Sequence, residues 1–300
     1  MREITVQANN NVNVVGKLLS ATFGDGTMSD GRRYERASLT VRVNQKIENN
    51  LETDEIPVSI FAAQFTKTGK PNPMYENIQR LKEMKTIQNV GIDNADWIRL
   101  SKANLQENPF VARNGQFYNG WQIRGAFCGK ASESPTEIAS FAADLFVLDM
   151  RDEVNSEGDT TGRLIVKGGL VQYGGALDVL EFVVEDPTKI DFIQRTWEVN
   201  NTVGVVGRIR VTTKEDHRPA ATSSWGEVLE EDTTRLVREL VITGGAQEPY
   251  EEEFAYDSAD IKKAFNIRKA KIEQMQIDAR NGANKTTQTS TKKAAKYDWE

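Results

Sequence analysis

The stretch from Asp96 to Lys130, DWIRLSKANLQENPFVARNGQFYNGWQIRGAFCGK, decides the fold of this 300-residue chain. It predicts two strands joined by a long hairpin. Aromatic and basic side chains alternate within it, and they are Trp97, Arg99, Lys102, Phe110, Arg113, Phe117, Tyr118, Trp121 and Arg124. Rings that stack on bases and cations that attract phosphates suit a single nucleic-acid strand. The alternative is that half of these rings belong to the core.

The alternation of side chains along each strand separates these two interpretations. One face of the second strand is assigned to the core, and its residues are Trp121, Ile123, Gly125 and Phe127. In the first strand Ile98 and Leu100 point inward. The predicted nucleic-acid contacts are therefore Trp97, Arg99, Lys102, Phe110, Arg113, Tyr118, Gln122 and Arg124. Each stacked base would contribute about 1–3 kcal/mol. A solvated sheet face that contains these residue types by chance is the alternative.

The composition is that of a globular protein, with 38% hydrophobic and 27% charged residues. A single cysteine, Cys128, excludes an internal disulfide, and a single histidine, His217, argues against a histidine-based metal site. The chain has no apolar run long enough to span a membrane, and its first residues lack the apolar region of a signal peptide. We expect a cytoplasmic protein that needs no metal and no cofactor.

Charge is distributed unevenly along the chain. Residues 1–150 hold 17 basic and 17 acidic residues, whereas residues 151–256 hold 11 and 21. Residues 257–300 hold 10 and 6. Because an acidic surface repels phosphate, the two parts of the body are not expected to share one task equally.

The first half has the element order of a five-stranded OB barrel, a fold whose strand face and loops bind single strands. Strands are predicted at 12–23, at 36–43, where Ala37, Leu39, Val41 and Val43 share one face, and around 56–60. The spacing of Met74, Ile78 and Leu81 predicts a helix to about Gln88. The two strands of the hairpin over 96–130 bring the number of strands to five, and a further strand is predicted over 141–150.

The second half repeats this order, which indicates tandem domains. The strand over 141–150 can begin a new barrel or finish the first. Strands are predicted at 162–170, 177–184, 203–211 and 236–242, with a helix that contains Ile190, Ile193 and Trp197. We therefore expect a mostly β protein with some α structure: two tandem five-stranded OB-fold barrels, over 1–140 and 141–250.

A helix is predicted over 251–281, with its start near Asp257 and its end at Gly282. Its narrow apolar stripe predicts docking on its own chain or on a neighbouring subunit. The sequence therefore leaves open whether the protein forms a homo-oligomer. The composition of 282–300 predicts a flexible tail. The tail ends in a candidate protein-binding motif of two aromatic and two acidic residues, Tyr297, Asp298, Trp299 and Glu300.

Residues 10–130 resemble the single-stranded DNA-binding proteins of bacteria and phages. The matching features are the segments 14–18, 36–43 and 97–100, the hairpin to 118–127, and the acidic-aromatic end. The resemblance implies sequence-independent covering of single-stranded DNA in replication, recombination or repair, with the tail recruiting replication or recombination proteins. Bacterial members normally have one barrel and a longer, more acidic tail, so a tandem form is more similar to a phage-encoded protein.

Two further clusters are candidate nucleic-acid contacts. The first lies at the entry of the second strand, and its residues are Arg32, Arg33, Tyr34 and Arg36. A solvated turn is the alternative there. The second cluster is in the second barrel, where Arg208 and Arg210 are expected to face outward and Trp225 lies in a loop. Its acidic surroundings favour a structural or protein-binding role instead.

No catalytic motif stands out from the sequence. Gly24 to Gly31 lacks the order of a calcium loop, and Gly69-Lys70-Pro71 lacks the remaining residues of a P-loop. Cys128 is interpreted as a small buried residue. The leading hypothesis is a non-enzymatic single-stranded DNA-binding protein. The alternative is a structural or replisome scaffold protein whose barrels contact proteins, and a DNA-processing nuclease is a third.

Overall fold

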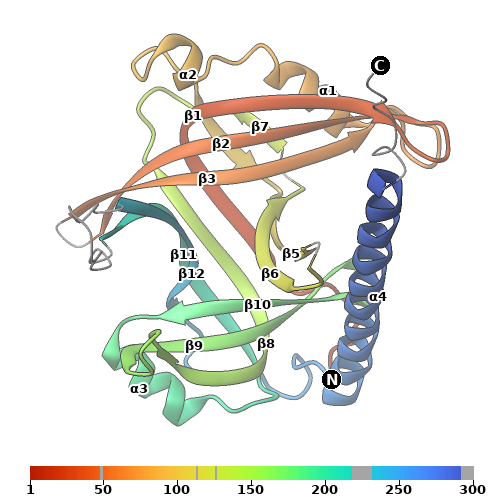
Figure 1. Ribbon diagram of the computed structural model, residues 1–300. Helices are drawn as coiled ribbons and strands as arrows, with labels where there is room; N and C mark the ends of the chain where they lie inside the picture. Colours follow the sequence, from red (N-terminus) through yellow and green to blue (C-terminus); the bar gives the residue numbers. More distant parts are fainter. Residues whose placement is uncertain (48–49, 113, 126, 218–231, 292–300) are drawn as a thin grey trace, which may run out of the picture.

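The computed structural model describes residues 1–47, 50–112, 114–125, 127–217 and 232–291. Within these ranges the strands form one continuous 12-stranded sheet, and helices lie against it (Figure 1). The predicted class, mostly β with a C-terminal helix, is confirmed. None of the helices in the described ranges is long and apolar enough to cross a membrane.

The first half contains three long strands, two short helices and a hairpin. Its elements are β1 (Asn10–Thr27), β2 (Arg33–Ile47), β3 (Asn50–Ala63), α1 (Pro73–Leu81), α2 (Ile87–Val90), β4 (Trp97–Ser101), β5 (Asn104–Val111), β6 (Phe117–Arg124) and β7 (Phe127–Lys130). β1, β2 and β3 are antiparallel neighbours, β6 pairs with β3 in parallel, and β4 pairs with β1. The pairings therefore run in a ring, in the order of an OB barrel.

The strands β4 to β7 form a single hairpin, as predicted from the stretch 96–130. One register holds from Ile98↔Lys130 through Asn104↔Arg124 to Val111↔Phe117. The hairpin is interrupted where Lys102 and Gly125 adopt positive φ angles of 56° and 74°. A left-handed residue resets the inward–outward alternation of a strand.

This interruption corrects one sequence-based assignment. Trp121 and Ile123 are buried, as predicted, but beyond Gly125 the buried residue is Cys128. Phe127, which was assigned to the core, is only half-buried. The prediction of Cys128 as a small buried residue is confirmed, and burial raises the pKa of its thiol to about 12.

The first helix is shorter than the sequence predicts. Ile78 and Leu81 are buried against the strands, as their spacing implies, but α1 ends at Leu81 instead of near Gln88. A second helical turn, α2, begins after Thr86, whose hydroxyl accepts a hydrogen bond from the Asn89 amide at 3.2 Å. The threonine cap starts a new helix there, so the two segments are separate.

The second half repeats the first half's order. Its elements are β8 (Ile138–Val154), β9 (Thr160–Val171), the 3-10 helix η1 (Tyr173–Gly175), β10 (Leu177–Val184), α3 (Pro187–Thr196), β11 (Thr202–His217) and β12 (Asp232–Gly245). The pairings β8–β9–β10–β12–β11–β8 close a five-stranded barrel. Its β10–β12 pair is parallel, like β3–β6, and α3 again follows the third strand.

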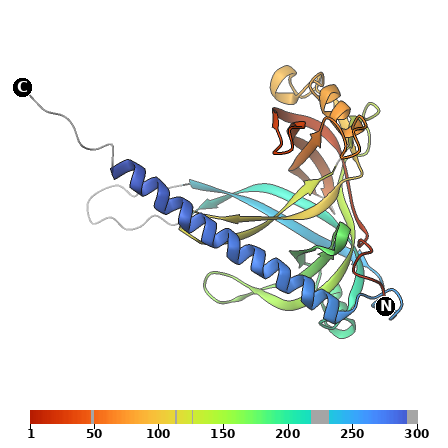
Figure 2. The same ribbon diagram turned by 90° about the vertical axis from the view of Figure 1, so that its right-hand side faces the viewer.

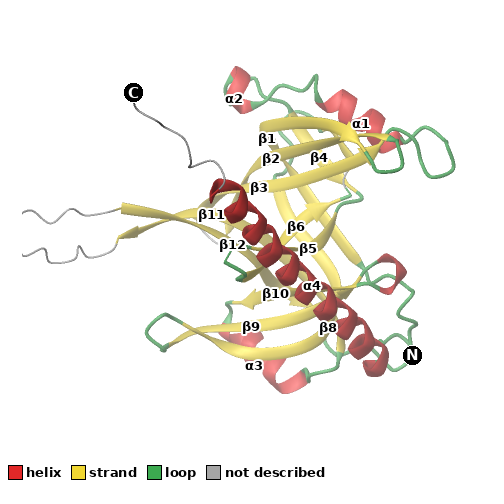
Figure 3. Ribbon diagram, turned by 45° about the vertical axis from the view of Figure 1, so that its right-hand side comes forward, coloured by secondary structure: helices red, strands yellow, loops and turns green. Residues whose placement is uncertain are grey.

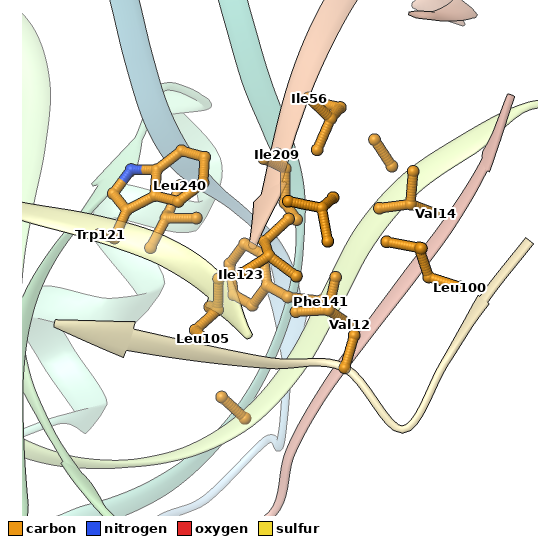
Figure 4. Close-up of a cluster of buried hydrophobic side chains, with 14 of the residues drawn as sticks. Val12, Val14, Ile56, Leu100, Leu105, Trp121, Ile123, Phe141, Ile209 and Leu240 are labelled. Carbon is orange, nitrogen blue, oxygen red and sulfur yellow. The ribbon is translucent and has the colours of Figure 1, made fainter. Parts of the chain in front are cut away.

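The two halves share a seam and a core. Residues Asn10–Val15 of β1 pair with Ile138–Ala143 of β8, and the same part of β8 also pairs with β11. β8 therefore continues the first half's sheet and begins the second barrel. Side chains from both halves pack in one hydrophobic cluster, and Figure 4 shows Ile56 of the first half near Ile209 of the second and Trp121 near Leu240.

The C-terminal helix α4 (Ser258–Thr291) lies along the hairpin and β10, so it docks on its own chain (Figures 2 and 3). Asp257 begins it, because its carboxylate accepts from the Ala259 amide at 2.7 Å. Ile261 and Ala264 are buried against Val179. The helix continues past Gly282, where the sequence predicted its end, since an interior glycine costs a helix only about 1 kcal/mol.

Candidate nucleic-acid interface

Aromatic and basic side chains from three strands meet on the outside of the first half. Arg36 of β2 is the register partner of Gly24 on β1 and of Phe61 on β3. Tyr34 lies in the next outward row, and its ring centroid is 5.0 Å from that of Phe61. We call the surface formed by Tyr34, Arg36, Phe61, Gln122 and Arg124 the basic-aromatic face.

Two glycines of β1 make room for this arrangement. A Cβ at Gly24 would lie 2.8 Å from Nε of Arg36, and a Cβ at Gly26 would lie 2.6 Å from the hydroxyl oxygen of Tyr34. Both contacts are too close for real atoms. Glycine at these positions therefore allows the arginine and the tyrosine to lie against β1.

Arg124 connects β3 to the hairpin. It is the register partner of Ser59 on β3 and of Asn104 on β5, and its side chain is exposed. The next outward pair is Gln106 and Gln122, and the Gln122 amide donates to the Glu107 carbonyl at 3.3 Å. The sheet thus carries a continuous outward surface from β1 through β2, β3 and β6 to β5.

The arginines on and beside this surface form no ion pairs within the described part of the chain. Arg33, Arg36 and Arg124 are exposed, and none of them lies within ion-pair distance of a carboxylate in the described part of the chain. Phe61 is 48% exposed. Exposed rings next to unpaired arginines can stack on bases and neutralise phosphates together.

Near its tip the hairpin carries a second aromatic pair. Phe110 and Tyr118 are register partners, their ring centroids are 6.4 Å apart, and they are 60% and 48% exposed. They extend the same hairpin face toward its tip, as predicted. The structure thus brings Phe110, Tyr118, Gln122 and Arg124 onto one face of the hairpin.

Helix α4 adds a wall beside this surface. A groove of about 360 Å³ separates the helix from the hairpin. Gln106, Gln122 and Arg124 line it on the hairpin side, and Ile267 and Lys271 line it on the helix side. A strand lying on Arg124 would therefore meet a second cation on the helix.

The wall is held in place by charged groups at the bottom of the groove. Arg268 of α4 donates from Nε to the Glu107 carboxylate at 2.7 Å, and that carboxylate is almost fully buried. The Glu107 amide donates to Asp178 of β10 at 3.1 Å. Burial raises the pKa of Asp178 to about 6, and the neighbouring Glu107 charge adds to the shift.

Trp97, Arg99 and Lys102 lie farther along the hairpin, outside the basic-aromatic face. The ammonium of Lys17 lies 5.0 Å from the centre of the half-buried Trp97 ring. Lys17 also donates to the Ile92 carbonyl. Arg99 and Lys102 are exposed, and Lys102 lies 5.5 Å over the Phe127 ring. Lys17 thus already contacts the Trp97 ring, which leaves less of the ring free to stack on a base.

Arg32 differs from its neighbours because its side chain forms hydrogen bonds within the turn. It donates to Asp30 at 2.6 Å and to the Phe65 carbonyl at 3.1 Å. Hydrogen bonds from Arg32 lower the pKa of the Asp30 carboxyl. Arg33, Tyr34 and Arg36 are left without such partners in the described ranges, so the cluster predicted from the sequence divides at Arg32.

Arg208 and Arg210 are placed differently from the prediction. They lie opposite Ile209 on β11, but each is only 9% exposed. Arg208 pairs with Glu52 of β3 at 2.6 Å, and Arg210 pairs with Glu185 at 2.6 Å and Glu239 at 2.7 Å. The expectation that they face outward is wrong, because carboxylates distant in the sequence cover them.

Six of the predicted contact residues lie outside the described residues. They are Arg113, Trp225, Tyr297, Asp298, Trp299 and Glu300. Conversely, Phe61 and Lys271 were missed. Extending the alternation of 56–60 by one residue would have placed Phe61 outward. No sequence signal could have set Lys271 beside Arg124, because a docked helix brings them together.

One protein family and several solved structures are similar to this chain. The model of a protein family described as YorF matches residues 8–278. A search of curated proteins gives no match. Among solved structures, the wild-type single-stranded DNA-binding protein from Thermus aquaticus is similar at 10% identity and a TM-score of 0.48, over 85% of this chain and 99% of that one.

Two further structures are similar to this chain. A deletion mutant of the Thermus aquaticus protein shows 13% identity and a TM-score of 0.49, over 82% of this chain and 97% of that one. The small single-stranded DNA-binding protein from Streptomyces coelicolor shows 13% identity and a TM-score of 0.26, over 41% of this chain and 95% of that one.

Proposed function

The chain belongs to the YorF family, and we propose that it is a non-enzymatic protein that binds single-stranded DNA without sequence preference. One observation carries the proposal: unpaired arginines and exposed rings share one outward sheet surface, the basic-aromatic face. Bases stack on Tyr34 and Phe61, while Arg36 and Arg124 neutralise the adjoining phosphates.

The preference for single strands follows from the chemistry of stacking. A base in a duplex is already stacked on its neighbours, so its faces are closed to Phe61. In the part of the chain that the structure describes, the face offers no row of buried, fixed donors that would distinguish one base from another. Rings and arginines accept any base, which supports covering DNA over recognising a sequence.

The biological setting is a further part of the proposal. Covering exposed strands in the cytoplasm protects them during replication, recombination or repair. The phage-type tandem form and the recruitment of replication or recombination proteins by residues 297–300 come from the resemblance and the sequence. Tail-deleted protein, ending at residue 291 so that α4 is kept whole, should bind DNA as the full chain does if the tail serves only partners.

Fluorescence anisotropy with labelled oligo-dT and a labelled duplex of equal length tests the proposal. We expect single-strand binding to be at least tenfold tighter and to weaken steeply with salt, by about 0.7 in logarithmic slope for each phosphate contact. Trp fluorescence should be quenched by oligo-dT. Equal affinity for both DNAs would refute the proposal.

Matched variants connect the binding to the face. The triple variant Arg36→Ala, Phe61→Ala, Arg124→Ala should lose most of its affinity for oligo-dT. The control removes an exposed arginine and an exposed ring elsewhere, by Arg195→Ala with Tyr173→Ala. A similar loss of affinity in this control would show that the binding is not located on the basic-aromatic face.

A protein scaffold is the second candidate, and the acidic second half favours it. In that case the barrels contact proteins and carry no nucleic acid. Oligo-dT should then leave Trp fluorescence and anisotropy unchanged, so the same titration decides between the two functions.

A further inference from the structure

A second groove lies between the hairpin and the second barrel. Its volume is about 570 Å³. β6 contributes Phe117, Asn119 and Trp121 to its wall, and β12 contributes Leu236 and Arg238. Asn119 fixes one side of it, because its side-chain amide donates to the Val179 carbonyl of β10 at 2.8 Å.

Arg238 is the central cation of this groove. Its guanidinium lies 4.6 Å from the centre of the Trp121 ring, and it donates to the Trp121 carbonyl at 2.9 Å. The residue is exposed, and no carboxylate lies within ion-pair distance of it in the described part of the chain. Its charge is therefore held in place by a ring and a carbonyl and left uncompensated.

The acidic residues of the groove wall are already neutralised. Glu181 pairs with Arg151 at 2.8 Å. Glu239 pairs with both Arg163 and Arg210, at 2.7 Å in each case. Lys167 also lines the groove, and its register partners on the neighbouring strands are Asp149 and Glu181, which pair with Arg151. Among the described residues the groove thus has a net positive charge, and Arg238 is the cation that lies against Trp121.

A buried donor in the same wall adds to this charge. Trp121 is 7% exposed, and its indole N–H has no hydrogen-bond partner among the described residues. Figure 4 shows Trp121 at the edge of the core cluster, with its ring nitrogen directed away from Ile123 and Phe141. Buried donors are nearly always satisfied, so an unpaired one beside a free arginine favours an anionic, acceptor-rich ligand.

This groove also meets the groove that follows α4. Arg268 lines both of them. The residues Trp121 and Arg124, which line one groove each, are three positions apart on β6 and point to opposite faces of the hairpin. A single strand that occupied both grooves would therefore run past Arg268 between Arg124 and Arg238.

From these observations we infer that the inter-barrel groove is a second contact site for the same single DNA strand, with Arg238 holding a phosphodiester and Phe117 and Leu236 facing its base. This inference rests on the proposed function and extends it. The strand begins on the basic-aromatic face, passes between α4 and the hairpin, and ends between the barrels. Without this site, the second barrel would take no part in binding.

The test uses two lengths of oligo-dT and the variant Arg238→Gln, which removes the charge and keeps most of the contact with Trp121. A single OB barrel occupies about 4–16 nucleotides, so oligomers of about 8 and about 30 nucleotides separate one site from two. We expect about fivefold weaker binding of the long oligomer, unchanged binding of the short one, and a salt slope smaller by about 0.7.

Three outcomes are informative. Unchanged affinity of Arg238→Gln for the long oligomer, or equal loss for both lengths, would overturn the groove assignment. If wild-type protein binds neither length, the proposed function fails instead, so the two failures are distinguishable. Arg195→Ala serves as the charge-matched control, and urea denaturation shows whether Arg238→Gln folds normally. If it does not, Arg238→Lys, which keeps the charge, should retain long-oligomer affinity, and its loss would also overturn the assignment.

Discussion

The two halves of the chain share a strand order but use their arginines in opposite ways. In the first half Arg36 and Arg124 are exposed and unpaired within the described ranges. In the second half Arg208 and Arg210 are covered by Glu52, Glu185 and Glu239. The same residue type therefore contributes to a candidate binding surface in one half and holds strands together in the other.

The difference shows that an arginine in the sequence is a poor predictor of a binding site unless the carboxylates that pair with it are also known. Residues 151–256 carry 21 acidic residues against 11 basic ones, so an arginine there has many carboxylates to meet. Arg208 even reaches Glu52 on β3, which belongs to the other half. Its ion pair joins the two halves, and the Val211 amide adds a hydrogen bond to Asp54 at 2.7 Å.

The largest expected effect is a loss of stability in the second half. Arg210→Ala removes the nearest cation of Glu185 and one of the two cations that pair with Glu239, and breaking a buried pair costs about 3–5 kcal/mol. We expect the free energy of unfolding in urea to fall by about 3 kcal/mol. The affinity of the folded variant for oligo-dT should change less than twofold.

Arg195→Ala is the control for this measurement, because Arg195 is exposed on α3. Its removal should change the free energy of unfolding by less than about 0.5 kcal/mol. If Arg210→Ala weakened DNA binding and left stability intact, the contrast between the two halves would be lost. Arg210 would then belong to the binding surface after all.

The fold was largely predictable because its signals are local. Alternation along 37–43 and 121–123 identified core residues that the structure buries. The repeated element order predicted the second barrel, and the pairings of β8 to β12 close it. Local periodicity failed at Phe127, because a left-handed Gly125 resets the alternation, and nothing in the pattern marks that.

The candidate site was predicted only in part, for a physical reason. Exposure depends on what covers a side chain, and covering groups come from distant strands. Glu52 is separated from Arg208 by most of both barrels in sequence, and Lys271 faces Arg124 only because α4 docks. Arg36 and Arg124 were found because alternation alone places them outward, and Tyr34 was found because it belongs to a cluster of basic and aromatic residues.

A smaller effect is expected where charged groups join the hairpin, β10 and α4. The pKa of Asp178 is raised to about 6 from an ordinary value of 3.8, so folding favours its protonated form. The stability that the folded state gains from protonated Asp178 is fully present below pH 3.8, and it is lost as the pH rises through 6. Relative to Asp178→Asn, the wild type should lose about 2 kcal/mol of stability between pH 4 and pH 7.

Asparagine is the matched change, because it resembles the protonated acid and can still accept from the Glu107 amide. The variant should match wild type near pH 4 and be more stable at pH 7 in parallel urea titrations. Other carboxyls have lowered pKa values, among them Glu185 and Glu239, so only the difference between the two proteins isolates Asp178. A constant difference at all pH values would contradict the assignment.

On the basic-aromatic face we expect an effect on binding and little effect on stability. Phe61→Ala removes a ring that is 48% exposed and packs at a tilt against Tyr34. Affinity for oligo-dT should fall by about 1.5 kcal/mol, or roughly tenfold. Tyr173→Ala, in the second half, is the control and should leave affinity unchanged. Equal losses in the two variants would show that aromatic exposure, and not position, explains the result.

The smallest effect is expected at the hairpin tip. Tyr118 and Phe110 face solvent with their ring centroids 6.4 Å apart, and α4 passes the tip, where a Cβ on Gly115 would lie 3.1 Å from Nε of Arg280. A base stacked there should contribute about 1 kcal/mol, so Tyr118→Ala should weaken oligo-dT binding about fivefold. Tyr118→Phe keeps the ring and should retain the affinity. Because neither change touches the core, the free energy of unfolding in urea should stay constant, and a cooperative loss of structure in Tyr118→Ala would mean that this ring supports the hairpin instead of a base.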